Sequence, residues 1–267
     1  MIRLLKIDFR KYIFSKTFWI LLAVYAVLLV LTFFLIEKIL NNIMIEAGQS
    51  APVPMPEFSL YSFPLVWHNL TYLAGFYKIF LALIVLSFVT NEFTYKTIRQ
   101  NVMNGMSRIQ FLFSKILFVF GLSLVSAIIL FISGSILGMN HTESVSTALF
   151  FEKIAFIPAY FLELFTFCSM ALLLAFLIQR SGLAIGLLAL YYYILEPIFS
   201  FIIPEQIASY LPVESMGNLI DIPNSAIMKM VGVNFREFIS VPDVYICSAY
   251  SLVFIGLTYL IIVKKDL

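Results

Sequence analysis

The chain has 267 residues, of which 62% are hydrophobic and 12% charged, and its formal net charge is +2. A soluble domain is nearer half apolar and about a quarter charged, so this composition excludes a soluble globular protein. We expect an all-α polytopic membrane protein built as a single transmembrane domain. The two cysteines, Cys168 and Cys247, lie in apolar runs. We expect them to be small buried side chains, with neither a disulfide framework nor a metal site.

Residues 1–16 read MIRLLKIDFRKYIFSK, with apolar side chains at helical spacing and basic side chains on the other side. This pattern predicts a basic amphipathic helix that lies in the headgroup plane before the first span. The alternative is a plain positive flank that only fixes the topology.

A bilayer core about 30 Å thick needs about 20 apolar residues in a helix. Six runs meet this length, near residues 18–38, 72–91, 111–138, 154–178, 183–203 and 244–263. Residues 179–182 read QRSG and predict a tight turn, whereas residues 204–243 form a long outer segment. Structureless loops of that length are uncommon in compact domains, so we expect partial helix there.

The lysines and arginines indicate the orientation of these spans. With the N-terminus inside, 12 of the 17 basic residues fall in inner segments and 5 fall in outer segments or spans. Basic residues are enriched in cytoplasmic loops, so both termini are expected in the cytoplasm. Residues 92–110 then form a cytoplasmic segment between the second and third spans.

Sequence motifs of hydrolytic enzymes are absent from this chain. It has no H-E-x-x-H, no G-x-S-x-G and no P-loop pattern G-x-x-x-x-G-K-[ST]. We therefore expect a non-catalytic subunit that binds no cofactor, so any ATP hydrolysis would belong to a partner.

Three ionisable residues fall within the predicted spans: Lys78, Glu163 and Glu196. Such residues are costly in a membrane and usually face the bundle interior or a cavity. We expect Lys78 to extend toward the outer headgroups. Glu163 either lines a pathway or anchors two helices by hydrogen bonding. Glu196 is expected to face outer water, beside a kink at Pro197.

The fifth span carries two further candidates. Tyr192 either packs in the bundle or presents its hydroxyl to a wet cavity, so it joins Glu163 and Glu196 as a pathway candidate. Two G-x-x-x-G patterns occur, Gly134 with Gly138 and Gly182 with Gly186. Such pairs let helices approach closely. The second pair opens the fifth span, so we expect it to be the site of helix packing or self-association.

Residues 91–115 carry the densest mixed charge between two spans. Glu92 is followed at i+4 by Lys96, which is a favourable helical pair. Asn104-Gly105 signals a break, and Ser107 is placed as the N-cap of the third span. The alternative is an ordinary positive-inside loop.

This stretch resembles the permease subunits of type-2 ABC exporters. In that family an acidic residue ends the second span, a Thr-containing segment and a Ser-Arg pair follow, and a Lys enters the third span. The corresponding residues here are Glu92, Thr97, Ser107-Arg108 and Lys115. The family often has Gly-Thr after the acid and Pro before Ser-Arg, where this chain has Lys96-Thr97 and Gly105-Met106.

The resemblance implies a coupling segment that docks on a separate cytoplasmic ATPase, which would bind ATP and Mg²⁺. The docking residues would be Glu92, Lys96, Thr97, Arg99, Ser107 and Arg108. It also implies a second permease copy, identical or paralogous, in a lipid bilayer, with no nucleic-acid partner. We expect a prokaryotic plasma (inner) membrane and an apolar or amphipathic cargo. The alternatives are a membrane-embedded enzyme or a secondary transporter that uses Glu163.

Overall fold

The computed structural model describes residues 14–49, 60–95, 105, 107–224 and 235–264, and within these ranges it is helical without strands. The predicted amphipathic helix at residues 1–16 lies almost wholly outside them. Five helices are long and apolar enough to cross a membrane, or six if one bent pair is counted as a span. An all-helical multi-pass membrane protein is therefore compatible with the described residues.

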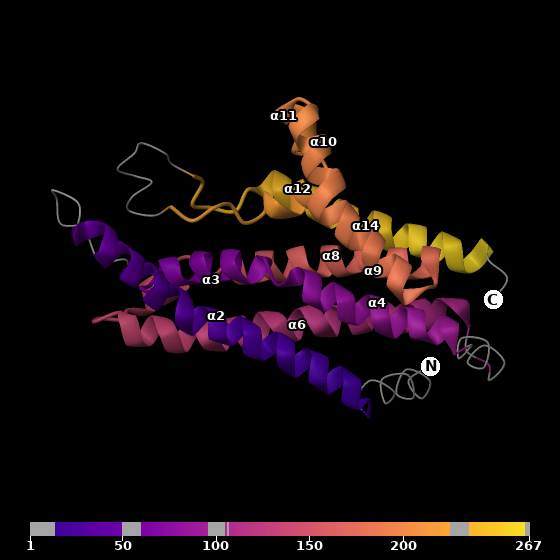
Figure 1. Ribbon diagram of the computed structural model, residues 1–267, viewed down its shortest axis with the longest axis horizontal. Coiled ribbons are helices and arrows are strands. Elements are labelled where there is room, and N and C mark those ends of the chain that lie inside the picture. The colour runs from indigo at the N-terminus through magenta and orange to yellow at the C-terminus, as the bar shows by residue number, and fades with distance from the viewer. Residues whose placement is uncertain (1–13, 50–59, 96–104, 106, 225–234, 265–267) are drawn as a thin grey trace.

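Figure 1 shows a lengthwise bundle from which one segment rises. The bundle contains α2 (Lys16–Gln49), α3 (Leu65–Gly75), α4 (Lys78–Thr94), α6 (Arg108–His141), α8 (Phe156–Ile178) and α14 (Val241–Lys264). The short α7 (Thr147–Phe151) precedes α8. The rising segment comprises α9 (Ser181–Leu190), the π-helix η1 (Tyr191–Leu195) and α10 (Glu196–Ile202).

Helix α8 is the centre of the bundle. It packs against α3, α4, α6, α9, α12 and α14. In the most apolar stretch of Thr147–Ile178, 67% of the residues are buried, whereas the corresponding share for Ser181–Ile202 is 11%. Small side chains along α8, such as Ala159, Ala171 and Ala175, are buried and let neighbouring helices approach. A helix that is apolar on all sides is expected in such a position.

The second apolar segment differs from the single span expected near residues 72–91. It consists of α3 and α4, which meet at 46° across Phe76 and Tyr77. No proline marks this break; the nearest sequence signal is Gly75. The apolar run therefore predicts the segment but not its bend.

The predicted turn at residues 179–182 is confirmed, because α8 ends at Ile178 and α9 begins at Ser181. Partial helix in residues 204–243 is also confirmed, in α11 (Glu205–Ala208) and α12 (Pro212–Gly217). Residues 225–234 of that segment lie outside the described residues. Both cysteines are buried and free, as expected.

Helix α2 lies at the edge of the bundle and is attached through polar contacts. The Tyr25 hydroxyl hydrogen-bonds Ser126 of α6 and lies 3.3 Å from the Tyr160 hydroxyl of α8. Ser126 and Tyr160 are 2.9 Å apart, so the three hydroxyls form a closed group. Buried hydroxyls need such partners, and this group fixes how α2 sits against α6 and α8.

A second attachment of α2 lies toward its C-terminal half. The Tyr61 hydroxyl donates to the Phe33 carbonyl, and Glu37 lies 3.0 Å from His141 at the end of α6. Burial raises the pKa of Tyr61 above its usual range, and the Glu37 carboxylate adds to the rise. The Tyr61 hydroxyl therefore stays protonated and keeps its role as a donor.

The two glycine pairs differ in their surroundings. A Cβ added to Gly138 would lie 2.4 Å from the Phe63 ring, and one added to Gly134 would lie 2.7 Å from the Trp67 ring. No atom of the described residues lies within 4 Å of a Cβ built at Gly182 or Gly186. Within this chain, close packing therefore uses the pair in α6, and the expected role of Gly182 and Gly186 in self-association stays a prediction.

This contrast predicts different costs for adding one methyl group along α6. Gly138→Ala should lower the free energy of unfolding by about 1–3 kcal/mol, because the Phe63 ring must move out of a packed site. Gly121→Ala is the matched control, since no described atom lies within 4 Å of its Cβ. It should be neutral or stabilising by up to about 1 kcal/mol. Thermal unfolding in detergent measures both, and equal midpoints would contradict the packing.

Candidate functional site

The candidate site is the junction where α4 ends and α6 begins. Gly105 in this junction has φ of +89°, a left-handed conformation that glycine adopts without steric cost. The Ser107 hydroxyl accepts from the Gln110 N–H at 3.2 Å, and the Gln110 side chain accepts from the Ser107 N–H at 3.1 Å. This capping box confirms Ser107 as the predicted N-cap of the third span.

A buried ion pair joins the two helices at this junction. Lys115 Nζ lies 2.7 Å from Glu92 Oε1, and both side chains are buried. The same Nζ lies 4.7 Å from the centroid of the Phe111 ring, one turn earlier in α6. A buried charge is tolerated only when it is paired, and the aromatic face adds to the attraction. The pair therefore fixes the end of α4 against the first turns of α6.

Arg108 connects the same junction to the last helix. Its Nη1 donates to the carbonyl oxygens of Ile262 at 3.3 Å and Val263 at 2.9 Å. These carbonyls belong to the last turn of α14, where helix ends lack internal donors and favour a cation. The guanidinium thus holds the start of α6 and the end of α14 together.

Aromatic contacts bring two more helices to the junction. Phe18 at the start of α2 lies 5.7 Å from Phe88 of α4 and 6.0 Å from Phe118 of α6. Phe176 near the end of α8 lies 5.2 Å from Phe93 of α4. Ends of α2, α4, α6, α8 and α14 therefore contact one another at one end of the bundle, which we call the junction end (Figure 1).

Three of the residues predicted to dock on an ATPase make contacts within this chain. Glu92 is buried against Lys115, Ser107 caps α6, and Arg108 contacts α14. The contact of Glu92 with Lys115 was not foreseen, and the predicted pairing of Glu92 with Lys96 stays a prediction because Lys96 lies outside the described residues. Three predicted docking residues lie outside the described residues: Lys96, Thr97 and Arg99.

A second buried ion pair joins the start of α4 to α8. It corrects the expectation that Lys78 extends toward the outer headgroups. Lys78 is only 5% exposed, and its Nζ lies 2.7 Å from Glu163 Oε1 of α8. Lys78 does not extend outward, because Glu163 compensates its charge inside the bundle. Of the two alternatives left open for Glu163, the contact between helices is the one these distances describe.

Tyr192 lies beside this ion pair. Its ring centroid is 5.5 Å from Lys78 Nζ, and the Phe167 ring of α8 lies at the same distance from that cation. The two rings contact each other edge to face at 5.4 Å. Tyr192 therefore packs against the bundle through its ring, as the sequence allowed, and contributes to the surroundings of the Lys78 charge.

Glu196 does not face water as expected, since it is 2% exposed. Its Oε1 accepts from the Glu214 backbone N–H at 2.7 Å, in the first turn of α12. A carboxylate is favoured at a helix N-terminus, which offsets part of the cost of burying Glu196, whose Oε2 has no hydrogen-bond partner among the described residues. The helix departs from α geometry just before Glu196, as the π-helix η1, and the kink expected at Pro197 stays a prediction.

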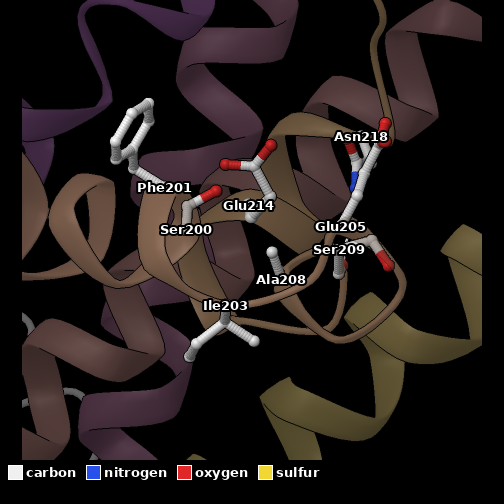
Figure 2. A pocket seen from close by; sticks show the side chains of 8 residues that line it. All are labelled: Ser200, Phe201, Ile203, Glu205, Ala208, Ser209, Glu214 and Asn218. Carbon is white, nitrogen blue, oxygen red and sulfur yellow. Dashed lines mark hydrogen bonds between the residues drawn. The ribbon is translucent and has the colours of Figure 1, made fainter.

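A hollow of about 360 Å³ lies where α10, α11 and α12 meet (Figure 2). It is lined by Ser200, Phe201, Ile203, Glu205, Ala208, Ser209, Glu214 and Asn218. The carboxylates and hydroxyls would suit a small polar or cationic group. No sequence motif marks these residues, although Pro204 precedes α11 and Pro212 begins α12.

The described residues contain no group of three or more His, Cys, Asp or Glu side chains that could hold a metal ion. His68 is buried, and its Nε2 lies 2.8 Å from the Asp221 carbonyl oxygen. Comparison with known proteins adds no identification: no family model matches the chain, and no curated protein matches it significantly.

The ion pair at the junction predicts a large effect of one substitution. Lys115→Met should lower the free energy of unfolding by about 3–5 kcal/mol, because it removes the cation that lies 2.7 Å from the buried Glu92 carboxylate. Lys38→Met, at an exposed lysine of α2, is the matched control. Replacing both Lys115 and Glu92 by Met should recover most of the loss, since both charges of the 2.7 Å pair are then removed together. Thermal unfolding of the purified variants tests this, and a loss no larger than in the control would contradict it.

Proposed function

We propose that this chain is the permease subunit of an ATP-driven ABC exporter. It would work as a dimer of identical or paralogous chains in a plasma (inner) membrane, with a separate cytoplasmic ATPase docked on residues 92–110. The observation that carries this proposal is the junction end, where Glu92–Lys115 and Arg108 tie α4, α6 and α14 together. A force applied between α4 and α6 would reach five helices through direct contacts.

The order of the residues supports the same reading. Glu92, Thr97, Ser107-Arg108 and Lys115 occur in the order seen in type-2 exporter permeases, and the chain lacks a P-loop of its own. The capping box at Ser107 and the left-handed Gly105 give the segment a defined end against α6. A defined end is needed if movement of a docked partner is to move the helix.

The internal contacts divide the docking residues into two roles. Glu92, Ser107 and Arg108 would act by connecting the segment to the bundle, because their side chains contact other helices or cap α6. Direct contact with the ATPase would then rest with Lys96, Thr97 and Arg99. Changing the first group should disturb stability as well as coupling, so the second group offers the cleaner test.

The experiment is extraction from the native membrane in a mild detergent, followed by identification of the proteins that copurify. We expect a P-loop ATPase in equal amount with this chain. The double variant Lys96→Glu/Arg99→Glu should lose most of the bound ATPase while inserting normally. Lys38→Glu is the matched control, because that exposed lysine lies far along α2 from the junction end.

Recovery of a fully active chain without any ATPase would overturn the proposal. Equal ATPase recovery from the native chain and the Lys96→Glu/Arg99→Glu variant would place the docking site elsewhere.

A secondary transporter is the second candidate, because broken helices beside a substrate site are common in such proteins. The bend between α3 and α4, with Lys78 and Glu163 beside it, is the observation that favours it. Uptake driven by an ion gradient in liposomes that contain this chain alone would support the transporter and exclude the exporter subunit.

A further inference from the structure

Three backbone N–H groups at the break between α3 and α4 remain hydrogen-bonded. Across it the N–H groups of Phe76, Tyr77 and Phe80 donate to carbonyls three residues earlier, at 3.3, 3.0 and 3.0 Å. Such tight turns inside a helix often mark a hinge, and they let the chain bend without leaving these polar groups unpaired. The segment therefore has a stable bend where two helical rods meet.

The ion pair of Lys78 and Glu163 lies at this bend. Lys78 is the first residue of α4, and a Cβ added to Gly75, the last residue of α3, would lie 3.5 Å from Glu163 Oε1. The carboxylate of α8 thus lies close to the end of one rod, and it holds the charge at the start of the other at 2.7 Å. One side chain links both rods to the central helix.

The other irregular helix of the described chain meets the same cation. The π-helix η1 carries Tyr192, whose ring centroid lies 5.5 Å from Lys78 Nζ. Single-turn π-helices are often found at functional positions. Two departures from regular helix, in the second and fifth apolar segments, therefore converge on one buried charge.

We propose that Lys78 and Glu163 form the latch of a hinge at residues 75–78. While the pair is closed, α3 and α4 keep their bend and Tyr192 stays against it. When the pair opens, α4 swings relative to α3, with Gly75 as the flexible joint. Lys78 and Glu163 act as positioning residues in this hinge. The proposal rests on these contacts alone and does not require an ATPase.

The test measures the distance between spin labels on the two rods, with the full chain in lipid nanodiscs. Labels go on Leu65→Cys at the start of α3 and Tyr95→Cys just after α4, on the order of 40 Å apart for helices of this length. Cys168 and Cys247 are buried, so the chain without added cysteines serves as the labelling control.

We expect one narrow distance distribution for the native pair and a broad one for Lys78→Met/Glu163→Met. The thermal midpoint of this double variant should stay within about 4 °C of the native value, because apolar side chains can replace a buried ion pair without much loss. Adding Gly75→Ala to the double variant should narrow the distribution again, since alanine stiffens the joint. If the pair is a latch, the double variant changes the distance distribution while its thermal midpoint is kept. If the pair only stabilises the fold, the distance distribution of the double variant stays that of the native chain.

Identical distance distributions in the native chain and the double variant would overturn the latch. If the double variant does not fold, the exchanged pair Lys78→Glu/Glu163→Lys keeps the contact and should restore the narrow distribution; a broad one would count against the latch. Gly75→Ala in the otherwise native chain leaves the ion pair closed, so its distance distribution should stay as narrow as that of the native chain. A broad distribution in this variant would count against the latch. None of these readouts uses transport or ATPase binding, so this proposal and the exporter function fail separately.

Discussion

The structure depends on the rule that a charge inside an apolar bundle must be compensated, and α4 is where this rule acts twice. Lys78 begins this helix and pairs with Glu163 of α8, and Glu92 lies near its end and pairs with Lys115 of α6. A lysine at a helix N-terminus and a glutamate near a helix C-terminus each carry the charge that the helix dipole disfavours at that end. Each partner carries the opposite charge, which compensates the buried ion and has the sign that the dipole favours there.

This arrangement fixes α4 at both ends, and it separates the proposed docking of a partner at one end from the proposed hinge at the other. The clamp at Glu92 faces the segment proposed to receive a partner, with Arg108 extending the connection to α14. The clamp at Lys78 faces the bend and the π-helix. In the proposed exporter, movement received at one clamp would travel along α4 to the other. The two clamps can also be tested independently, since each has its own partner helix.

Local sequence signals predicted much of the fold, and long-range contacts set the limit. The apolar runs, the Ser107 cap, the QRSG turn and helix in the outer segment each follow from neighbouring residues. The partner of Lys78 lies 85 positions away, and one sequence does not reveal which distant carboxylate will meet a lysine. Burial of Glu196 was missed for the same reason, because the N–H that it accepts belongs to α12. The two G-x-x-x-G pairs look alike in sequence, and only the rings of Phe63 and Trp67 distinguish them.

The separation of the two ion pairs along the chain has a consequence for biosynthesis. Glu92 and Lys115 are 23 positions apart in the chain, so they can pair as soon as the start of α6 has been made. Lys78 must wait for α8, and at about 5–20 residues per second this delay is on the order of 10 s. An uncompensated lysine within an apolar segment is costly in a membrane. The nascent chain therefore needs water, headgroups or the insertion machinery around Lys78 until Glu163 of α8 has been made.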